Sequence, residues 1–400
     1  MTDPLPRVLF LVAQPFFRWR GSPIRVAYDV SALAESGYRV DLVTLPLGEP
    51  IDIPGVRIHR VGNPLRVRDI PIGPSAAKLF FNGLLMARAR RLIREERPAA
   101  IHGVEECGML AWWLARRCGA RAVYEKHSDP ASHRGNPLRN LLMRGYAAME
   151  RFLVRRVDML IGTGPGLVEQ AQRMGCRAPC HHVPDIPSSR RGADPDKVAS
   201  MRAQWAGDGT TVLVTYVGSF AAYQGIDLLF DAIPEVARQR PGVRFVIIGG
   251  TPPQIAQRRA QLAAAGCERA VIFAGTVAPD QLPSWLAACD ILLSPRVSGT
   301  NTPLKLLDYL KTGRAIVATD IAANRQILDP DNALFVEPRP AALAAGIVTL
   351  ADDPERRRQL GQAGAERIRR VYNYEVFKTG LANAYAGLLG TDPGEPRPTP

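Results

Sequence analysis

The repeating unit of the fold is clearest at residues 211–248, TVLVTYVGSFAAYQGIDLLFDAIPEVARQRPGVRFVII. Its β-branched runs Val212–Val217 and Arg244–Ile248 predict two strands, and Asp227–Arg238 between them has the apolar spacing of a helix. A strand, a helix and a second strand in this order are typical of a parallel sheet covered by helices. The rest of the chain repeats this pattern in both directions.

Towards the carboxyl terminus the alternation of strands and helices continues. Further strands are predicted at Val271–Ala274, Ile291–Ser294 and Ala315–Ala318, and helices at Pro253–Ala265, Pro279–Ala288, Pro303–Thr312, Ala341–Ala351, Pro354–Val371 and Tyr374–Leu389. Towards the amino terminus, strands are predicted at Val8–Val12, Arg39–Leu45, Arg57–Val61, Ala100–His102, Ala122–Tyr124 and Met159–Ile161, and helices at Ile24–Glu35, Ala76–Glu96, Cys107–Arg117 and Leu138–Arg156.

The sequence therefore predicts an α/β protein of two Rossmann-like, doubly wound domains, at residues 1–180 and 181–372. Residues 176–210 show no strong period and are interpreted as the connection. The proline-rich tail at 391–400 is expected to be disordered. Open parallel sheets bind ligands beyond the carboxyl ends of their strands, so two such domains facing each other across a cleft would suit the joining of two substrates.

The composition excludes several classes of protein. Hydrophobic residues make up 46% and charged residues 22% of the chain, which excludes wholesale disorder. No apolar run approaches the ~20 residues of a membrane-spanning helix. The short apolar start, Val8–Ala13, is interpreted as a strand and not as a secretion signal.

The net charge of +13 is concentrated in the first half of the chain. Residues 1–200 carry 30 basic and 19 acidic side chains, whereas residues 201–400 carry 21 and 19. An anionic partner, such as a membrane surface, a nucleic acid or a phosphorylated substrate, explains this asymmetry, and so does a solvated surface that is merely rich in arginine. No nucleic-acid-binding module is recognisable, so we expect no nucleic-acid partner.

The six cysteines form no CxxC pair. Cys176 and Cys180, followed by His181 and His182, have some features of a metal knuckle, but no second ligand pair follows at zinc-finger spacing. Buried free thiols in a reducing compartment are the preferred interpretation, and we expect no metal site.

Two glycine turns that follow strands suit a phosphate. Gly21 precedes a predicted helix with Ser22 as its cap and Pro23 as its first residue, although an ordinary capped turn is the alternative. The second turn follows the strand Val212–Val217, where glycine lets a ligand approach the backbone. Its candidate residues are Gly218, Ser219, Gln224 and Gly225.

The strongest motif lies at residues 299–313, GTNTPLKLLDYLKTG. Thr302 suits the N-cap of a helix and Pro303 its first position, so Lys305 and Asp308 share one face. A lysine this close to a helix N-terminus opposes the helix dipole, and its position favours a bound anion over a solvated side chain. Asp308 would accept hydrogen bonds from sugar or ribose hydroxyls. The expected site residues are Asn301, Thr302, Pro303, Leu304, Lys305 and Asp308.

The order of these motifs resembles that of the two-domain GT-B glycosyltransferases, specifically the retaining family 4 enzymes that use nucleotide sugars. Gly21 is similar to the family's first glycine-rich loop, Gly218–Gly225 to its Gly-Arg…Lys-Gly phosphate segment, and residues 300–308 to its Glu–seven residues–Glu motif. The string Gly-Thr-Asn-Thr-Pro-Leu-Lys resembles a bacterial subgroup. The resemblance covers nearly the whole chain and implies that a last helix, at 373–390, crosses back to the first domain.

The chain departs from the family at four motif positions. Ser219 and Gln224 stand where the family has arginine and lysine, so two cationic diphosphate contacts are missing. Thr300 replaces the first glutamate, and Asp308 is one methylene shorter than the second. Lys305 would restore one positive charge.

The family places a histidine after a strand of the first domain, near the sugar. His127 follows the predicted strand Ala122–Tyr124 and fits this position better than His102. The resemblance thus implies that His127 is catalytic, acting as a neutral hydrogen-bonding group, and that His102 and Glu105 lie near the sugar or acceptor. The alternative is a hydrogen-bonded strand-end histidine without a catalytic role.

The resemblance implies transfer of a sugar from a nucleoside-diphosphate sugar to an acceptor, without a metal or other cofactor, because Lys305 and a helix dipole can stabilise the leaving diphosphate. The acceptor would be a glycan, a lipid-linked compound or a small molecule, such as a cell-envelope precursor. Two alternatives stay open: an inactive GT-B binding protein, and a nucleotide-sugar epimerase of the same architecture.

Cationic segments suggest contact with an anionic lipid surface. Residues Arg60–Arg97 contain nine basic and three acidic side chains, interleaved with Leu79, Phe80, Phe81, Leu84 and Leu85. Leu138–Arg156 repeats the pattern, for which a core-facing helix with a solvated basic face is the alternative. We expect a cytoplasmic protein, compatible with a peripheral position at the inner face of the cytoplasmic membrane.

Overall fold

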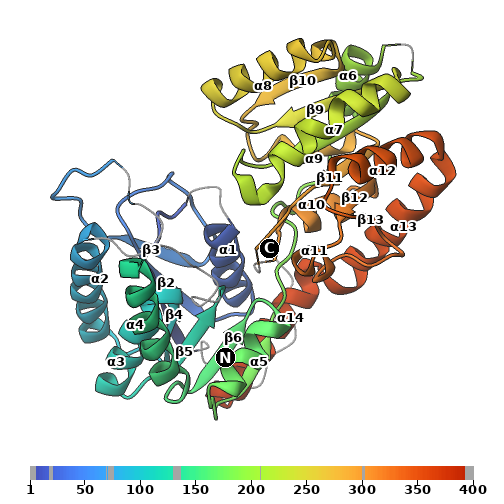
Figure 1. Ribbon diagram of the computed structural model, residues 1–400. Coiled ribbons are helices and arrows are strands. Elements are labelled where there is room, and N and C mark those ends of the chain that lie inside the picture. Colours follow the sequence, from blue (N-terminus) through green and yellow to red (C-terminus); the bar gives the residue numbers. More distant parts are fainter. Residues whose placement is uncertain are drawn as a thin grey trace. The chain divides into compact units, whose positions relative to one another are not determined.

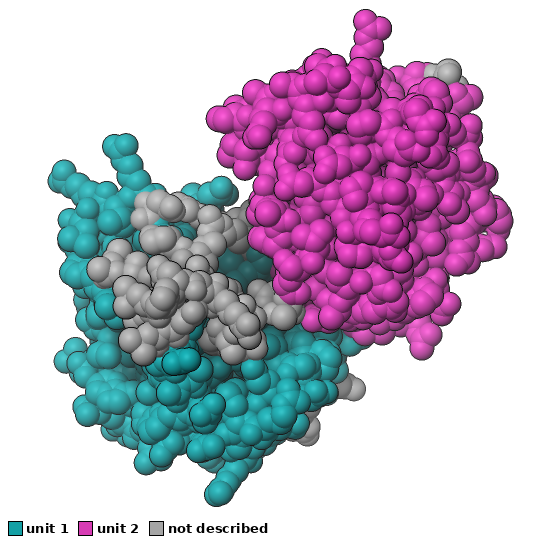
Figure 2. Space-filling view, viewed as in Figure 1, with its two compact units in different colours: residues 1–185, 374–400 teal, residues 186–373 magenta. Residues whose placement is uncertain are grey.

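The computed structural model describes residues 6–17, 21–68, 70, 76–128, 137–207, 209–299 and 302–391. These residues form two parallel sheets, of seven and six strands, each covered by helices (Figure 1). The chain divides into two compact units, coloured separately in Figure 2. Unit 1 comprises residues 1–185 and 374–400, and unit 2 comprises residues 186–373. The predicted α/β class with two doubly wound parallel sheets is confirmed.

Unit 1 holds the seven-stranded sheet, with strand order β3-β2-β1-β4-β5-β6-β7. The strands are β1 (Arg7–Val12), β2 (Arg39–Thr44), β3 (Val56–Arg60), β4 (Ala100–Val104), β5 (Arg121–Lys126), β6 (Met159–Gly162) and β7 (Cys180–His182). The helices are α1 (Gly21–Glu35), α2 (Ala76–Glu95), the 3-10 turn η1 (Glu105–Cys107), α3 (Gly108–Cys118), α4 (Pro137–Val154), α5 (Pro165–Arg173) and α14 (Tyr374–Leu389). The strand order reverses between β1 and β4, and such a switch point is where open parallel sheets bind ligands.

All six residues of β1 are buried, as expected for a central parallel strand covered on both faces. Leu9 and Leu11 belong to one core cluster with Phe81 and Leu85 of α2. Phe10 stacks on His102, at 4.2 Å between ring centroids. Because successive strand residues point to opposite faces, β1 contributes to the core on both sides of the sheet.

Unit 2 holds the six-stranded sheet, with strand order β10-β9-β8-β11-β12-β13. The strands are β8 (Val212–Val217), β9 (Val243–Ile248), β10 (Val271–Gly275), β11 (Ile291–Ser294), β12 (Ala315–Thr319) and β13 (Leu334–Val336). The helices are α6 (Pro195–Ala206), η3 (Ala222–Gln224), α7 (Ile226–Gln239), α8 (Pro252–Ala264), η4 (Glu268–Ala270), α9 (Leu282–Ala287), α10 (Lys305–Lys311), α11 (Ala322–Arg325), α12 (Pro340–Asp352) and α13 (Pro354–Val371). The predicted bounds of α13 and α14 agree with the structure residue for residue.

The interpretation of residues 176–210 as irregular is wrong in two places. Strand β7 pairs in parallel with β6, and α6 is a regular helix of 12 residues. Helix α6 buries little beyond Trp205 and Ala206, so the apolar period that identifies a helix in sequence is weak. Its start does carry a signal, since Asp194 caps the helix and Pro195 follows.

The starts of two functional helices differ from the prediction. Helix α1 begins at Gly21, so Ser22 lies in the first turn and is not the cap. Helix α10 begins at Lys305 after Leu304, and the expected N-cap at Thr302 is wrong. The hydroxyl of Thr302 donates to Gln326 Oε1 at 2.7 Å instead. The predicted disordered tail lies outside the described residues except for Thr391.

Candidate active site

The first candidate site lies in unit 1, where α1 begins and β4 and β5 end. His127 follows β5, Glu105 follows β4, and Ser22 lies in the first turn of α1. His127 Nδ1 is 2.7 Å from Ser22 Oγ, and the backbone N–H of His127 donates to Glu105 Oε1 at 2.6 Å. Residues that the sequence analysis proposed separately are therefore direct neighbours at the switch point of the sheet.

The imidazole of His127 is held at both ring nitrogens and is 11% exposed. Besides the contact of Nδ1 with Ser22, Nε2 lies 3.0 Å from Glu125 Oε1. Burial lowers the pKa of this imidazole, but the charge and hydrogen bond of Glu125, together with the charge of Glu105, outweigh burial and raise the pKa to about 9. This raised pKa favours the imidazolium at neutral pH, in contrast to the neutral ring that the resemblance implied.

His102 lies beneath His127 and has no exposed surface. Its Nε2 is 2.8 Å from Glu125 Oε2, and its Nδ1 is 2.7 Å from the hydroxyl of Tyr385 in α14. Burial lowers the pKa of His102, so this ring is neutral. His102 therefore supports the site from inside the unit and does not line it. The resemblance had implied a position near the sugar or acceptor.

Glu105 joins the ends of β4 and β5. Its carboxylate accepts hydrogen bonds from the backbone N–H of His127 and, at 3.2 Å, from the hydroxyl of Ser128. The residue has a φ of +50°, in the left-handed region that non-glycine residues rarely adopt. Strained backbone of this kind is concentrated at functional sites. Glu105 is close to His127, as expected, and fixes the backbone that carries it.

Arg25 of α1 stands in a group of three carboxylates that the sequence analysis missed. Its Nε lies 3.1 Å from Asp29 and 3.0 Å from Glu125, and its Nη1 lies 3.4 Å from Asp185. Arg25 also lies over the ring of Phe377 in α14, at 4.6 Å. The one sequence signal was the i,i+4 spacing of Arg25 and Asp29 on α1. Neither residue stood out, because such pairs are common on solvated helix faces.

The second candidate site lies in unit 2, at the carboxyl end of β8. Gly225 has a φ of +73°, and a Cβ there would lie 1.7 Å from Pro295 O. A Cβ at Gly249 would lie 2.0 Å from Gly218 O. Only glycine allows these close approaches, so the turns after β8, β9 and β11 pack against one another.

Lys305 of α10 reaches into the turn after β8. Its Nζ donates to Val217 O and Gln224 Oε1, both at 3.2 Å, and lies 4.6 Å from the ring of Tyr216. Burial, together with the charge of Arg296, lowers the pKa of Lys305 to about 7. Among the residues that the structure describes, no carboxylate pairs with this ammonium group. The structure thus brings Lys305, Gln224 and Gly218 together.

Arg296 is a second cation at this site that the sequence analysis missed. It is 6% exposed, its Nε donates to Ser298 O at 2.8 Å, and its guanidinium lies 5.4 Å from the ring of Tyr223. The available signal was its position two residues beyond Ser294, the end of strand β11, since charged side chains at the carboxyl ends of parallel strands are candidates for ligand binding.

The remaining predicted residues of this site are more dispersed. Asp308 Oδ1 accepts a hydrogen bond from the backbone N–H of Ser188 at 2.7 Å, and burial raises the pKa of this carboxyl to about 6. Ser219 is exposed, Pro303 is buried, and Leu304 takes the cap position of α10. Thr300 and Asn301 lie outside the described residues.

Two Asp-x-Asp sequences, which in some enzymes hold a metal ion, have local structural roles in this chain. Asp194 Oδ1 accepts from the backbone N–H groups of Asp196 and Lys197 at the start of α6. Asp329 Oδ1 accepts from the backbone N–H of Asp331 in a turn. Within the described ranges, no group of three or more His, Cys, Asp or Glu side chains could hold a metal ion, and the six cysteines are free thiols.

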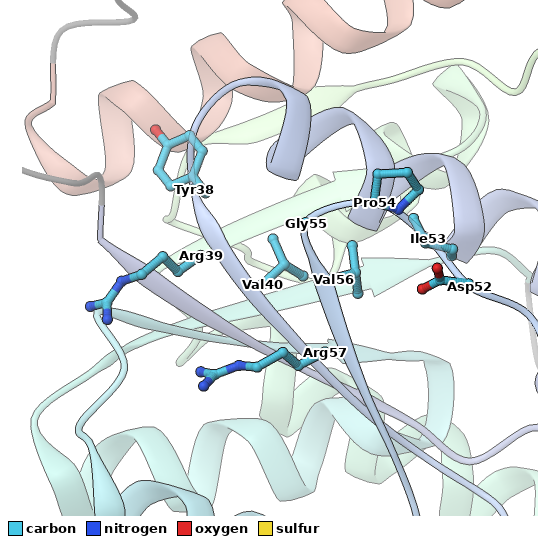
Figure 3. A pocket seen from close by; sticks show the side chains of 9 residues that line it. All are labelled: Tyr38, Arg39, Val40, Asp52, Ile53, Pro54, Gly55, Val56 and Arg57. Atoms are coloured by element: carbon cyan, nitrogen blue, oxygen red, sulfur yellow. The ribbon is translucent and has the colours of Figure 1, made fainter. Parts of the chain in front are cut away.

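A cavity of about 580 Å³ lies in unit 1, away from the His127 cluster (Figure 3). Figure 3 labels its lining residues at the amino ends of β2 and β3, among them Tyr38, Arg39 and Arg57. Arg39 and Arg57 are engaged in ion pairs with Glu96 and Asp41. Because parallel sheets bind ligands at the opposite, carboxyl ends of their strands, this cavity is not the candidate active site.

Among the described side chains of the cationic segments, some apolar residues are exposed and others are buried. On α2, Leu79 is 75% and Phe80 is 41% exposed, whereas Phe81 and Leu85 are buried in the core. Phe152 of α4 is 37% exposed. The apolar residues that interleave with the basic ones on α2 are therefore divided between the surface and the core. No helix in the described parts of the chain has the length and apolarity needed to cross a membrane.

Comparison with known proteins identifies the family. Residues 20–185 match the glycosyl transferase 4-like domain, and residues 211–353 match the glycosyl transferases group 1. D-inositol 3-phosphate glycosyltransferase of Segniliparus rotundus is 25% identical over 92% of this chain and 85% of that protein. Phosphatidyl-myo-inositol mannosyltransferase of Mycobacterium tuberculosis is 27% identical over 50% of this chain, and the match spans about half of that relative's length, 53%.

Solved structures share the fold at low sequence identity. Sucrose-phosphate synthase from Thermosynechococcus elongatus has a TM-score of 0.76 at 20% identity, covering 96% of this chain and all of the other. HepE from Anabaena, solved with UDP and glucose, has a TM-score of 0.72 at 14% identity with the same coverage. The chain therefore belongs to the glycosyltransferases, with a glycosyl transferase 4-like domain at residues 20–185 and a group 1 glycosyl transferase domain at residues 211–353.

Proposed function

We propose that the protein is a retaining glycosyltransferase that moves a sugar from a nucleoside-diphosphate sugar to an acceptor. One observation carries the proposal: the ammonium group of Lys305 is buried at the carboxyl end of β8, with no carboxylate partner among the described residues. A bound anion offsets the cost of burying such a charge, and the diphosphate of the donor is a suitable anion. HepE, which shares the fold, was solved with UDP and with UDP-glucose.

The cations of unit 2 would stabilise the leaving diphosphate. When the bond between the anomeric carbon and the diphosphate oxygen breaks, negative charge grows on that oxygen, and fixed positive charges nearby lower the barrier. Lys305 and Arg296 would supply the two charges that the family resemblance assigns to arginine and lysine, at positions occupied here by Ser219 and Gln224. We propose that these two cations act without a metal ion.

His127 would act through its positive charge. Its Nδ1 lies 2.7 Å from the hydroxyl of Ser22, and its Nε2 forms an ion pair with Glu125 at 3.0 Å. A charged imidazole favours an anionic part of the reacting substrate over the cationic sugar ring. We therefore propose an electrostatic role for His127 in the transition state, in place of proton transfer.

The acceptor that the relatives' names favour is a lipid-linked or cell-envelope glycan precursor. The relatives include a D-inositol 3-phosphate glycosyltransferase and phosphatidyl-myo-inositol mannosyltransferases. The exposed Leu79 and Phe80 on α2, a helix that also carries five basic side chains, favour contact with an anionic lipid surface. We propose that the protein docks peripherally on such a surface to reach its acceptor.

A thermal-shift screen of nucleoside diphosphates and their sugars tests the proposed function. A ligand at about 100 times its dissociation constant stabilises a protein by about 2.7 kcal/mol, which is readily measured. Stabilisation together with sugar transfer to an added acceptor is expected. Stabilisation without transfer would indicate a binding protein, and release or isomerisation of the sugar without an acceptor would indicate an epimerase. Lack of stabilisation by every nucleoside diphosphate would refute the proposal.

A further inference from the structure

A chain of polar contacts, made of two hydrogen bonds and one ion pair, runs through unit 1 from α14 to His127. The hydroxyl of Tyr385 in α14 lies 2.7 Å from His102 Nδ1, and His102 Nε2 lies 2.8 Å from Glu125 Oε2. The other oxygen of the same carboxylate, Glu125 Oε1, lies 3.0 Å from His127 Nε2. Tyr385, His102 and Glu125 are completely buried.

The direction of each hydrogen bond in this chain follows from the charges. Burial raises the pKa of Glu125, but Arg25 and the two histidines outweigh burial and hold it well below the ordinary value, so the carboxylate is charged. Neutral His102 then donates from Nε2 to Glu125 and accepts at Nδ1 from Tyr385. Charged His127 donates from Nδ1 to Ser22, and its Nε2 side forms an ion pair with Glu125.

Buried polar groups of this kind are an unfavourable way to stabilise a fold. Burying a carboxylate and two imidazoles costs several kcal/mol, and well-packed apolar residues of similar volume often stabilise a fold as well or better. Aromatic rings already flank His102 on both sides, with Phe10 at 4.2 Å and Tyr385 at 6.2 Å between ring centroids. A buried polar chain that ends at a candidate catalytic group therefore points to a role in the reaction.

We propose that Glu125 is a positioning residue for sugar transfer, and that His102 and Tyr385 hold Glu125 in turn, so that helix α14 sets the orientation and charge of His127. Only the predicted effect on turnover rests on the proposed function. The state of the His127 imidazole is a property of the protein itself and can be measured without substrate.

Other charged groups also face His127 and Glu125. Arg25 and Asp29 face them from α1, Asp185 from the segment after β7, and Glu105 from η1. Burial raises the pKa values of Asp29, Asp185 and Glu105, and the nearby charges of Arg25 and His127 offset this only in part. Glu125 is the only one of these carboxylates with an oxygen near the His127 ring in the described structure, so its removal should act on His127 directly.

The test is an NMR titration of the full-length protein labelled with ¹⁵N-histidine. The signal of His127 is assigned by its loss in His127→Gln. In Glu125→Gln we expect the pKa of His127 to fall towards the ordinary value of about 6.5. Turnover should fall roughly 10- to 100-fold while the KM for the donor stays within about threefold, and the alkaline limb of the pH–rate profile should move to lower pH.

Tyr385→Phe provides a second, milder variant with a matched control. It removes only the hydroxyl at the far end of the chain, and we expect a smaller shift of the His127 titration in the same direction. The control is Tyr38→Phe, since the Tyr38 ring lies 5.8 Å from Tyr385 but its hydroxyl bonds to Thr391, outside the chain. We expect no shift in Tyr38→Phe.

An unchanged His127 titration in a folded Glu125→Gln would overturn the proposal. If Glu125→Gln does not fold, Tyr385→Phe decides: a titration identical to that of Tyr38→Phe overturns the proposal, and a downward shift supports it. Failure of the proposed function is recognised separately, by the absence of nucleoside-diphosphate binding and of sugar transfer in the unmodified protein. In that case the titration still decides whether α14 controls the charge of His127.

Discussion

His102 and Tyr385 are separated by 283 residues in the chain, yet His102 Nδ1 lies 2.7 Å from the Tyr385 hydroxyl. The contact joins the second-to-last turn of α14 to β4, directly beneath the candidate active site of unit 1. His102 is the middle residue of β4, and the contact gives its buried ring a hydrogen-bond partner. The contact also makes the last helix of the chain part of the support of the first-domain site, although α14 follows the whole of unit 2 in sequence.

Substitution of Lys305 by alanine should weaken binding of a nucleoside diphosphate about 10- to 100-fold, because a charge-assisted hydrogen bond to phosphate is worth about 1.5–3 kcal/mol. Binding of the bare nucleoside should be nearly unchanged. Isothermal titration with both ligands measures the difference. Lys311→Ala is the control, since its ammonium bonds to the carbonyls of Ser189 and Arg191. Equal small losses for both ligands in Lys305→Ala would contradict a phosphate role.

Nucleoside-diphosphate affinity should fall as the pH rises from 7 to 9. The pKa of Lys305 is lowered to about 7 by burial, and only the protonated ammonium attracts the diphosphate. The stability of the ligand-free protein should change in the opposite direction. Lys305 binds its proton more tightly in the unfolded chain than in the folded protein, so the free energy of unfolding should increase as the pH rises from 7 to the ordinary pKa of lysine. Lys305→Arg, which stays charged, should bind with a flat pH profile. A wild-type profile as flat as that of the arginine variant would show that Lys305 does not titrate in this range.

Transferase activity should survive EDTA. Lys305 and Arg296 are proposed to stabilise the leaving diphosphate, and both Asp-x-Asp sequences are engaged in local structure. Initial rates are measured after incubation with the chelator and again after addition of magnesium or manganese. Loss of activity with EDTA and its recovery with either metal would refute metal independence.

His127→Ala should lose roughly a hundredfold or more in turnover, the range of a positioned catalytic group, while nucleotide affinity is retained. Since the pKa of His127 is raised to about 9, its ion pair with Glu125 stabilises the fold fully below its ordinary pKa and is lost as the pH rises through about 9. The stability difference between wild type and His127→Ala should therefore shrink over this pH range. His102→Ala should lose less turnover but more stability, because its ring is completely buried. Near wild-type turnover in both variants would leave only a structural role for the two histidines.

Binding to liposomes should increase with the fraction of anionic lipid and decrease with salt, because surface attraction between arginines and lipid headgroups is screened. The exposed apolar pair Leu79 and Phe80 on α2 should contribute. Sedimentation of Leu79→Ser/Phe80→Ser is compared with that of wild type, and Val376→Ser on α14 serves as an exposed apolar control. Equal recovery of wild type with neutral and anionic vesicles would indicate that the basic segments form only a solvated surface.

The class of fold and the positions of most helices and strands follow from local sequence patterns. Buried parallel strands are continuous apolar runs and helices have a period of 3.6 residues, so both are visible within a window of a few residues. This is why α13 and α14 were predicted with their observed bounds. Prediction from the sequence failed at α6, whose buried face is small. It also failed at Thr302, whose hydroxyl bonds to Gln326 and does not cap α10.

Which polar side chains meet depends on how distant segments of the chain are folded together. The strand order places β5 beside β4 and brings Glu125 between His102 and His127, and the return of α14 adds Tyr385. The charge of His127 depends on these neighbours, because burial alone would make the ring neutral, as it does for His102. Arg296 and Lys305 likewise form one site because the turns after β8, β9 and β11 approach one another closely at Gly225 and Gly249. A pattern of residues encodes local structure, whereas electrostatics depends on distance and burial, which the fold alone defines.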